Sequence, residues 1–260
     1  MQRSRQSVVT RQAVSCNALG RLLVVLYQSP PPQKIDMKFT EFAKSRKSAR
    51  GFLDKPISKE IVDQIIDAAK WAPSSYNTQT WRVHAVAGEP LNKIRQGNTE
   101  NTLAGRPQVR DFPYKEEYDG VHRQRQIDVA VQLFDIMGIE RHDKEKRTDW
   151  MLRGFRQFDA PVSLVLTYDK ALEPAAISQF SLGSLAYGIV LAAWERGIGC
   201  VINGQGIMQS DVVHEHANIP HDQAIMICIA MGYPDADFQA NSVRSTRADN
   251  SEFVTYVGFE

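Results

Sequence analysis

Residues 178–196 read SQFSLGSLAYGIVLAAWER, and this stretch is apolar on most faces of a helix. A helix that is hydrophobic all round has to be buried on all sides, so we expect the central helix of the domain here. Small residues along it, including Gly183 and Gly188, let a second backbone approach closely, which also suits a subunit interface. Gly197 follows this stretch and is a typical C-terminal cap.

The remaining elements follow from periodicity and turn residues. Continuous apolar runs predict buried strands, and alternating runs predict half-buried ones. The strands expected on these grounds are 81–87, 162–168, 201–206, 224–231 and the tail 253–259. Further helices are expected within 38–50, after the N-cap Ser58, over 127–136 and over 212–217, while 88–150 as a whole combines helices with a mobile excursion. Because these elements alternate without a strict βαβ rhythm, the fold class expected is α+β.

Composition excludes several classes of protein. The chain has 260 residues, 43% hydrophobic and 23% charged, with a formal net charge of +1, so nothing indicates nucleic-acid binding. No run reaches the roughly 18 apolar residues that a membrane span needs. The three cysteines, Cys16, Cys200 and Cys228, are far apart, and the last two lie in apolar runs. We expect these two to be buried reduced thiols, which suits a cytoplasmic protein.

The first 36 residues differ from the rest. No acidic residue precedes Asp36, whereas five basic residues do, and three prolines stand at 30–32. Such a composition is typical of an organelle transit peptide. The interpretation that we favour is an unstructured extension, or a start assigned too early with Met37 as the true first residue. The globular domain is therefore expected over 37–260.

Common catalytic motifs are absent. The nearest approach to the dinucleotide fingerprint is Gly197-Ile198-Gly199, where the third glycine is missing. There is no phosphate-binding P-loop and no G-x-S-x-G nucleophile turn. The pair His214 and His216 would point to different faces of a helix, so no metal site is expected.

Four polar segments remain, and each suits a planar, anionic ligand. In 46–50 (RKSAR), guanidinium forks and a hydroxyl fit a phosphate, although a solvated basic turn has the same composition. Segment 73–81 (PSSYNTQTW) gathers small donors and amides, as an ordinary turn would. Segment 203–206 (NGQG) lets backbone approach a flat ring, and Arg244 with Arg247 adds cations near the end of the chain.

Taken together, these motifs resemble the nitroreductase superfamily of FMN enzymes. The match comprises R-K-S-A-R-x-F, A-P-S-S-Y-N-x-Q-x-W, F-D-A-P-V, G-Y-P, N-x-x-R-x-x-R and F-V-x-x-V-G-F, in that order. The match covers about residues 38–260. Within the superfamily, the chain most resembles the nitrobenzoate-reductase-like members. The resemblance implies an intertwined homodimer, a central mixed or antiparallel sheet flanked by helices, and two FMN sites at the interface.

The resemblance also implies roles for individual residues. Arg46, Ser48, Arg50 and Arg247 would meet the FMN phosphate and ribityl chain, with Lys47 and Arg244 beside them. The second subunit would supply Pro73, Ser74, Ser75, Asn77 and Gln79. Arg156, with Arg153 beside it, would lie near flavin N1 and C2=O, where a cation stabilises the reduced ring. Asn203, Gly204 and Gln205 would face N5, although family members often have an acidic residue where Gly204 stands.

The reaction implied is ping-pong hydride transfer from NAD(P)H through flavin N5 to a nitroaromatic, quinone or related small acceptor. No catalytic side chain is required, because the cofactor carries the chemistry. Two alternatives stay open at this point. One is another flavin chemistry on the same fold, such as reductive dehalogenation or flavin fragmentation, and the other is a non-catalytic flavin-binding protein.

Deleting residues 1–36 tests the domain boundary. We expect the truncated chain, beginning at Met37, to remain soluble and to bind flavin as the full chain does, because the deleted segment lacks the patterning of a core element. Flavin content and thermal midpoint of the two purified proteins provide the measurement. Loss of soluble, flavin-loaded protein on truncation would place essential residues before Met37.

Overall fold

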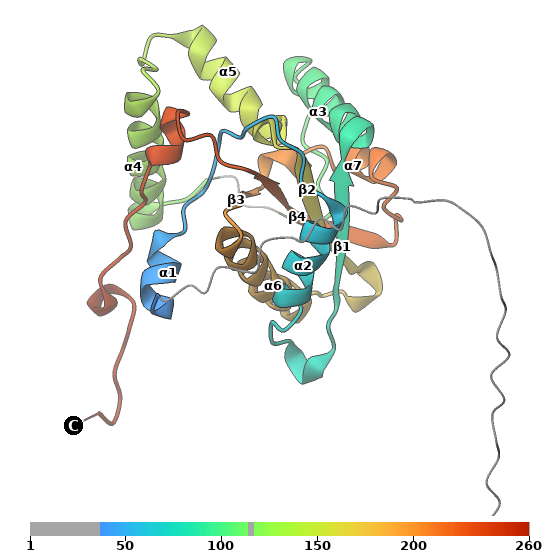
Figure 1. The fold of residues 1–260 in the computed structure, drawn as a ribbon, viewed down its shortest axis with the longest axis vertical. Helices are drawn as coiled ribbons and strands as arrows, with labels where there is room; N and C mark the ends of the chain where they lie inside the picture. The colour runs from blue at the N-terminus through green and yellow to red at the C-terminus, as the bar shows by residue number, and fades with distance from the viewer. Residues whose placement is uncertain (1–36, 114–116, 260) are drawn as a thin grey trace, which may run out of the picture. The chain divides into compact units, whose positions relative to one another are not determined.

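The computed structural model describes residues 37–113 and 117–259, so the expectation for 1–36 lies outside the described residues. Figure 1 shows helices on both faces of a small sheet. The helices are α1 (Phe39–Ser45), α2 (Lys59–Ala69), α3 (Gly88–Leu103), α4 (Gly120–Ile136), α5 (Lys144–Phe155), α6 (Ala176–Glu195) and α7 (Ser210–His216). The strands are β1 (Trp81–Ala87), β2 (Val162–Asp169), β3 (Gly199–Asn203) and β4 (Gln223–Gly232).

The sheet has the order β1-β2-β4-β3, and its neighbouring strands are antiparallel. This arrangement confirms the α+β class and four of the five expected strands. The fifth expectation, a strand over 253–259, was wrong, because these residues follow the short 3-10 turn Asn250–Glu252 without forming a strand. Alternation describes side chains alone, whereas a strand also needs a neighbour to pair with, and the tail finds none among the described residues.

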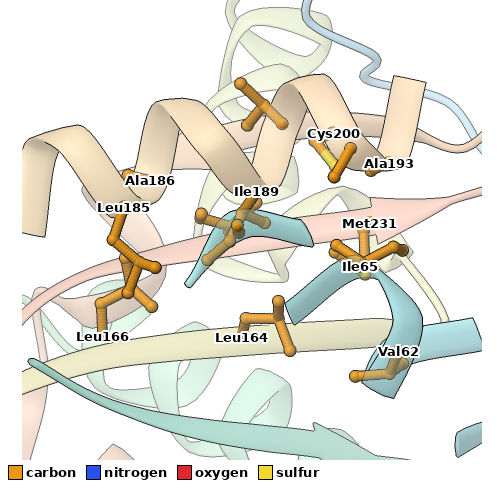
Figure 2. Close-up of a cluster of buried hydrophobic side chains, with 14 of the residues drawn as sticks. Val62, Ile65, Leu164, Leu166, Leu185, Ala186, Ile189, Ala193, Cys200 and Met231 are labelled. Atoms are coloured by element: carbon orange, nitrogen blue, oxygen red, sulfur yellow. The ribbon is translucent and has the colours of Figure 1, made fainter. Parts of the chain in front are cut away.

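The helix α6 packs with α2 on one face of the sheet. Leu185, Ile189 and Ala193 are at most 1% exposed and share a core with Leu164 and Leu166 of β2. Figure 2 shows these side chains gathered between the helix and the strands. The opposite face is covered by α3 and α7, whose Leu91, Ile94 and Val213 pack against Val165 and Ile225 in a second core. Successive residues of β2 thus point to opposite faces, as strand geometry requires.

Within one chain, α6 is not buried on all sides as expected. Ile177, Phe180 and Tyr187 are exposed, and they form an apolar stripe along one side of the helix. A second backbone does approach α6 closely at Gly188, and it belongs to α2 of the same chain. A Cβ added at Gly188 would lie 3.3 Å from the main chain of Ala69 in α2. The stripe is therefore the part of the central helix that its own chain leaves uncovered.

By length and composition alone, α6 is the one helix in the described part of the chain that qualifies as a membrane span. A count of consecutive apolar residues did not identify α6 as a candidate span, because Ser181 and Ser184 interrupt the run. The mean hydropathy of the helix nevertheless stays high enough for it to qualify. Half of the hydropathic stretch of α6 is buried inside the protein, as the core helix of a folded domain would be. The two cysteines expected to be buried, Cys200 and Cys228, are buried free thiols, and burial raises the pKa of each to about 12.

Candidate functional site

Two basic segments that are far apart in the sequence line one cavity of about 650 Å³. One is 46–50 after α1, and the other is 243–247 near the end of the chain. Six of the fourteen lining residues are cations and none is acidic. The cations are Lys44, Arg46, Lys47, Arg50, Arg244 and Arg247. The structure therefore joins the first and fourth polar segments of the sequence into one strongly positive site.

The edge of the sheet holds the first basic segment in place. The Ala49 N–H donates to the Cys200 carbonyl of β3 at 3.0 Å, and Ser48 forms an isolated bridge with the same residue. A little further on, the Leu53 N–H donates to the Tyr233 carbonyl at 2.9 Å. The segment thus runs along the otherwise free edge of β3, and its alternate side chains are directed by that extended backbone.

The cations of this cavity are poorly compensated. Among residues 37–113 and 117–259, Arg46, Lys47 and Arg50 form no ion pair with a carboxylate. Burial lowers the pKa of Arg50, and burial followed by repulsion from Arg244 lowers the pKa of Lys47. Both effects disfavour the charged forms, and a bound anion would oppose both. A phosphate group is the anion that guanidinium forks fit best, so the donor set matches the phosphate of a nucleotide-like cofactor.

The turn after α2 does not reach this cavity within one chain. The Gln79 N–H donates to Ser74 Oγ at 3.0 Å, and Tyr76, Asn77 and Gln79 adopt left-handed backbone conformations. Tyr76 is fully exposed at its tip. Figure 1 places this turn between α2 and β1, away from α1. The predicted residues Pro73, Ser74, Ser75, Asn77 and Gln79 thus form a preorganised, solvent-facing loop.

Arg153, in the last turn of α5, and Arg156, which caps that helix, have different surroundings. Arg153 donates from Nη2 to the Arg50 carbonyl at 3.3 Å, so it touches the basic segment directly. Arg156 forms ion pairs with Asp149 at 3.4 Å and with Asp159 at 3.3 Å. Of the two, Arg153 is therefore the closer neighbour of the cavity, while a contact of Arg156 with flavin stays a prediction.

The turn after β3 is tied to the end of α5. Asn203 is buried, donates from Nδ2 to the Gly154 carbonyl at 2.7 Å and accepts from the Gln205 N–H at 2.9 Å. Gly204 has ordinary right-handed torsions, φ −79° and ψ −25°. An added Cβ there would meet nothing nearer than a methyl of Ile227 at 3.9 Å. The chain's own fold therefore does not require glycine at this position.

Histidines take structural contacts rather than a shared cluster. His214 lies with Nε2 at 2.9 Å from an Asp111 carboxylate oxygen and with Nδ1 at 3.0 Å from the Ile219 carbonyl. Within the described ranges, no group of three or more His, Cys, Asp or Glu side chains is arranged to hold a metal ion. These contacts fix the loop before α4 against α7 and β4.

One residue that sequence reasoning did not select lies between the two basic segments. Asn241 is 3% exposed and hydrogen bonds to the backbone of Arg50 and Gly51. The signal available in the sequence was its place at the start of N-x-x-R-x-x-R, three residues before Arg244. That motif drew attention to the arginines, because an amide carries no charge to mark it.

Comparison with known proteins identifies the family of this chain. A model described as the nitroreductase family matches residues 43–233. The nitrobenzene nitroreductase of Ectopseudomonas oleovorans is 35% identical over 223 residues, covering 84% of this chain and 96% of that protein. The chloronitrobenzene nitroreductase of Comamonas testosteroni is 32% identical, with coverage of 84% and 96%. The FMN-dependent nitroreductase NfnB of Mycobacterium smegmatis, solved with NADPH, is 25% identical with a TM-score of 0.77, covering 84% of this chain and 97% of that one.

The two glycines of the turn after β3 should respond differently to alanine. Gly204→Ala should leave stability unchanged or raise it by about 0.4–1 kcal/mol, because the torsions suit any residue and the unfolded chain loses entropy. Gly206→Ala should destabilise by about 1–3 kcal/mol. Its Cβ would lie 2.7 Å from Gln157 Cγ and 2.8 Å from Cys228 Sγ.

Denaturant unfolding of both variants beside the unsubstituted protein measures the two effects. The matched pair isolates the effect of side-chain crowding, since the two glycines lie two residues apart in one turn and neither has a positive φ. Equal losses of stability in both variants would contradict the packing described for this turn.

Proposed function

Because this chain belongs to the nitroreductase family, we propose that it is an oxidoreductase that binds FMN and uses NAD(P)H to reduce a nitroaromatic, quinone or related small acceptor. The observation that carries this proposal is the cavity whose six cations face no acidic lining residue. Such a site gains most from a dianionic phosphate, and FMN ends in one. The names of the relatives, which describe reduction of nitrobenzene and chloronitrobenzene, support the acceptor class.

The donor set fits the phosphate end of FMN. Arg46, Arg50 and Arg247 would hold the phosphate, and the Ser48 hydroxyl would donate a further hydrogen bond. Lys47 and Arg244 line the same cavity and would add positive potential. On this assignment Arg153 and the turn Asn203–Gln205 lie further along the cofactor, since Arg153 touches Arg50 and the turn contacts the end of α5.

FMN, when bound, supplies the hydride chemistry at N5. The side chains described above then bind and orient the cofactor, and none is required as a general acid or base. Nicotinamide and acceptor would use the same open ring face in turn, which makes the kinetics ping-pong. We further propose a cytoplasmic location, in keeping with the two buried free thiols.

We propose that the active form is a homodimer in which each chain completes the site of its partner. Three exposed surfaces support this assembly: the apolar α6 stripe of Ile177, Phe180 and Tyr187, the polar loop 73–79 with Tyr76 at its tip, and the closing segment with Phe253 and Phe259. A second copy that covered these surfaces would also bring Ser74, Ser75 and Asn77 toward a cofactor. C2 pairing is the commonest solution for such self-complementary patches.

Replacing Phe180 by aspartate tests the dimer. Phe180 is 77% exposed on α6, so Phe180→Asp leaves the core intact while placing a charge on the proposed interface. We expect the variant to be monomeric by light scattering and to lose flavin. Met151→Asp, an exposed position on α5, is the control and should remain dimeric. A dimeric, fully loaded Phe180→Asp protein would exclude this face of α6 from the interface.

Replacing Arg46 by alanine tests the phosphate assignment. We expect Arg46→Ala to weaken FMN binding by about 1.5–3 kcal/mol, as for loss of a charged hydrogen bond. Flavin fluorescence titration of apoprotein measures the change. Arg82→Ala on the exposed side of β1 removes the same charge outside the cavity and should bind FMN as the unsubstituted chain does. Equal affinities for all three proteins would place the phosphate elsewhere.

Anaerobic reduction of the purified protein tests the activity itself. The proposal expects a yellow protein that NADPH or NADH bleaches and that a nitroaromatic or quinone reoxidises. A yellow protein that no reduced nicotinamide bleaches would instead be a flavin-binding protein without this activity. Colourless protein that takes up no FMN would overturn the proposal as a whole.

A further inference from the structure

We propose that Asn241 is a positioning residue that locks the two basic segments of the cofactor site together, and thereby gives the site its preference for a phosphorylated flavin. This inference rests on the proposed function. Asn241 belongs to the 3-10 turn Gln239–Ser242, which follows β4 and precedes Arg244. Its side chain is buried, so its contacts are made away from water.

The amide of Asn241 uses its full hydrogen-bonding capacity. Its Oδ1 accepts from the Arg50 N–H at 2.7 Å and from the Gly51 N–H at 3.2 Å. Its Nδ2 donates to the Gly51 carbonyl at 2.8 Å and to the Asp235 carbonyl at 2.8 Å. An Asn side chain offers two donors and one acceptor oxygen with two lone pairs, so all four bonds are made.

Neighbouring groups complete the hold on the same backbone. The Arg50 carbonyl is the one backbone polar group of Arg50 and Gly51 that Asn241 does not bind, and it accepts a hydrogen bond from Arg153. The Arg153 guanidinium also lies over the Phe238 ring, 4.7 Å from its centre. The Phe238 ring occupies the space of a Gly51 side chain, because an added Cβ would lie 2.2 Å from its Cγ. Every backbone donor and acceptor of Arg50 and Gly51 is therefore engaged by a remote part of the chain.

A second tie lies at the other end of the basic segment. Arg244 donates from Nη1 to the Ser45 carbonyl at 2.7 Å. The links Asn241 to Arg50 and Arg244 to Ser45 thus bracket the segment 46–50, and they set its register against 244–247. Arg46, Lys47 and Arg50 on one side then face Arg244 and Arg247 on the other across a single cavity.

Charge explains why an amide suits this position. The two segments carry like charges that line one cavity, so a structural link has to hold them together before any anion binds. A carboxylate could accept from the Arg50 and Gly51 N–H groups, but it could not donate to the Gly51 and Asp235 carbonyls. Its charge would also oppose the positive potential that attracts a phosphate. The neutral Asn241 joins the segments and leaves the potential intact.

Comparing FMN with riboflavin isolates this role, because riboflavin has the same ring and ribityl chain without the phosphate. We expect apoprotein of the unsubstituted chain to bind FMN far more tightly than riboflavin. Asn241→Ser and Asn241→Asp should each reduce this preference at least about tenfold, mainly by weakening FMN. The aspartate variant is nearly isosteric, so it keeps the packing while it loses two donors and gains a charge. Ser242→Ala, at the exposed neighbouring position, should keep the full preference.

The outcomes separate the two proposals. If the variants bind FMN and riboflavin with equal losses, or with no loss, Asn241 has only a structural role and the inference is overturned. If the unsubstituted chain itself binds FMN no better than riboflavin, the phosphate assignment in the proposed function fails, and the inference fails with it. Folding of each variant is checked by circular dichroism. Where the serine variant does not fold, the neutral and similarly sized Asn241→Leu decides, because the charge of the aspartate variant would by itself weaken FMN binding.

Discussion

The gathering of like charges in one cavity is the constraint on which the cofactor site depends. Arg50 and Lys47 are held where burial opposes their charge, and no acidic side chain lines their cavity. Such a cluster cannot hold itself together, because like charges repel each other. Its geometry has to come from neutral contacts, and these are the backbone pairing with β3 and the amide of Asn241.

The antiparallel sheet and its two layers of helices provide the rigidity that this geometry needs. Leu164 and Ile189 are fully buried on one face, and Val165 and Ile225 on the other. Packing on both faces fixes β3 at the edge, and the basic segment inherits its position from that edge. The turn after β3 is likewise held by α5 through Asn203. The segments 46–50, 203–206 and 244–247 therefore all take their positions from the same sheet and helices.

A single chain leaves apolar surface uncovered in places that matter for the site. The α6 stripe, the tip of the loop 73–79 and the closing segment all present aromatic side chains to solvent. Contiguous apolar patches of this kind mark interaction surfaces in soluble proteins. The homodimer that we propose would cover all three together, and it would bring the small polar donors of the loop toward the cavity of the partner.

Local periodicity in the sequence determined most of the strands, the helices outside 88–150, the α+β class and the polar segments, because strand alternation, helix spacing and caps such as Ser58 depend only on near neighbours. Within 88–150 it indicated helices in general and located only part of α4, and it did not give the bounds of α3 or α5. Only the tertiary structure decided which segments meet. The bond from Arg50 to Asn241 spans 191 residues, and Arg153 rather than Arg156 touches the basic segment. The tail 253–259 alternates like a strand yet forms none. Pairing, partners and burial are properties of contacts between distant segments, and no local pattern encodes them.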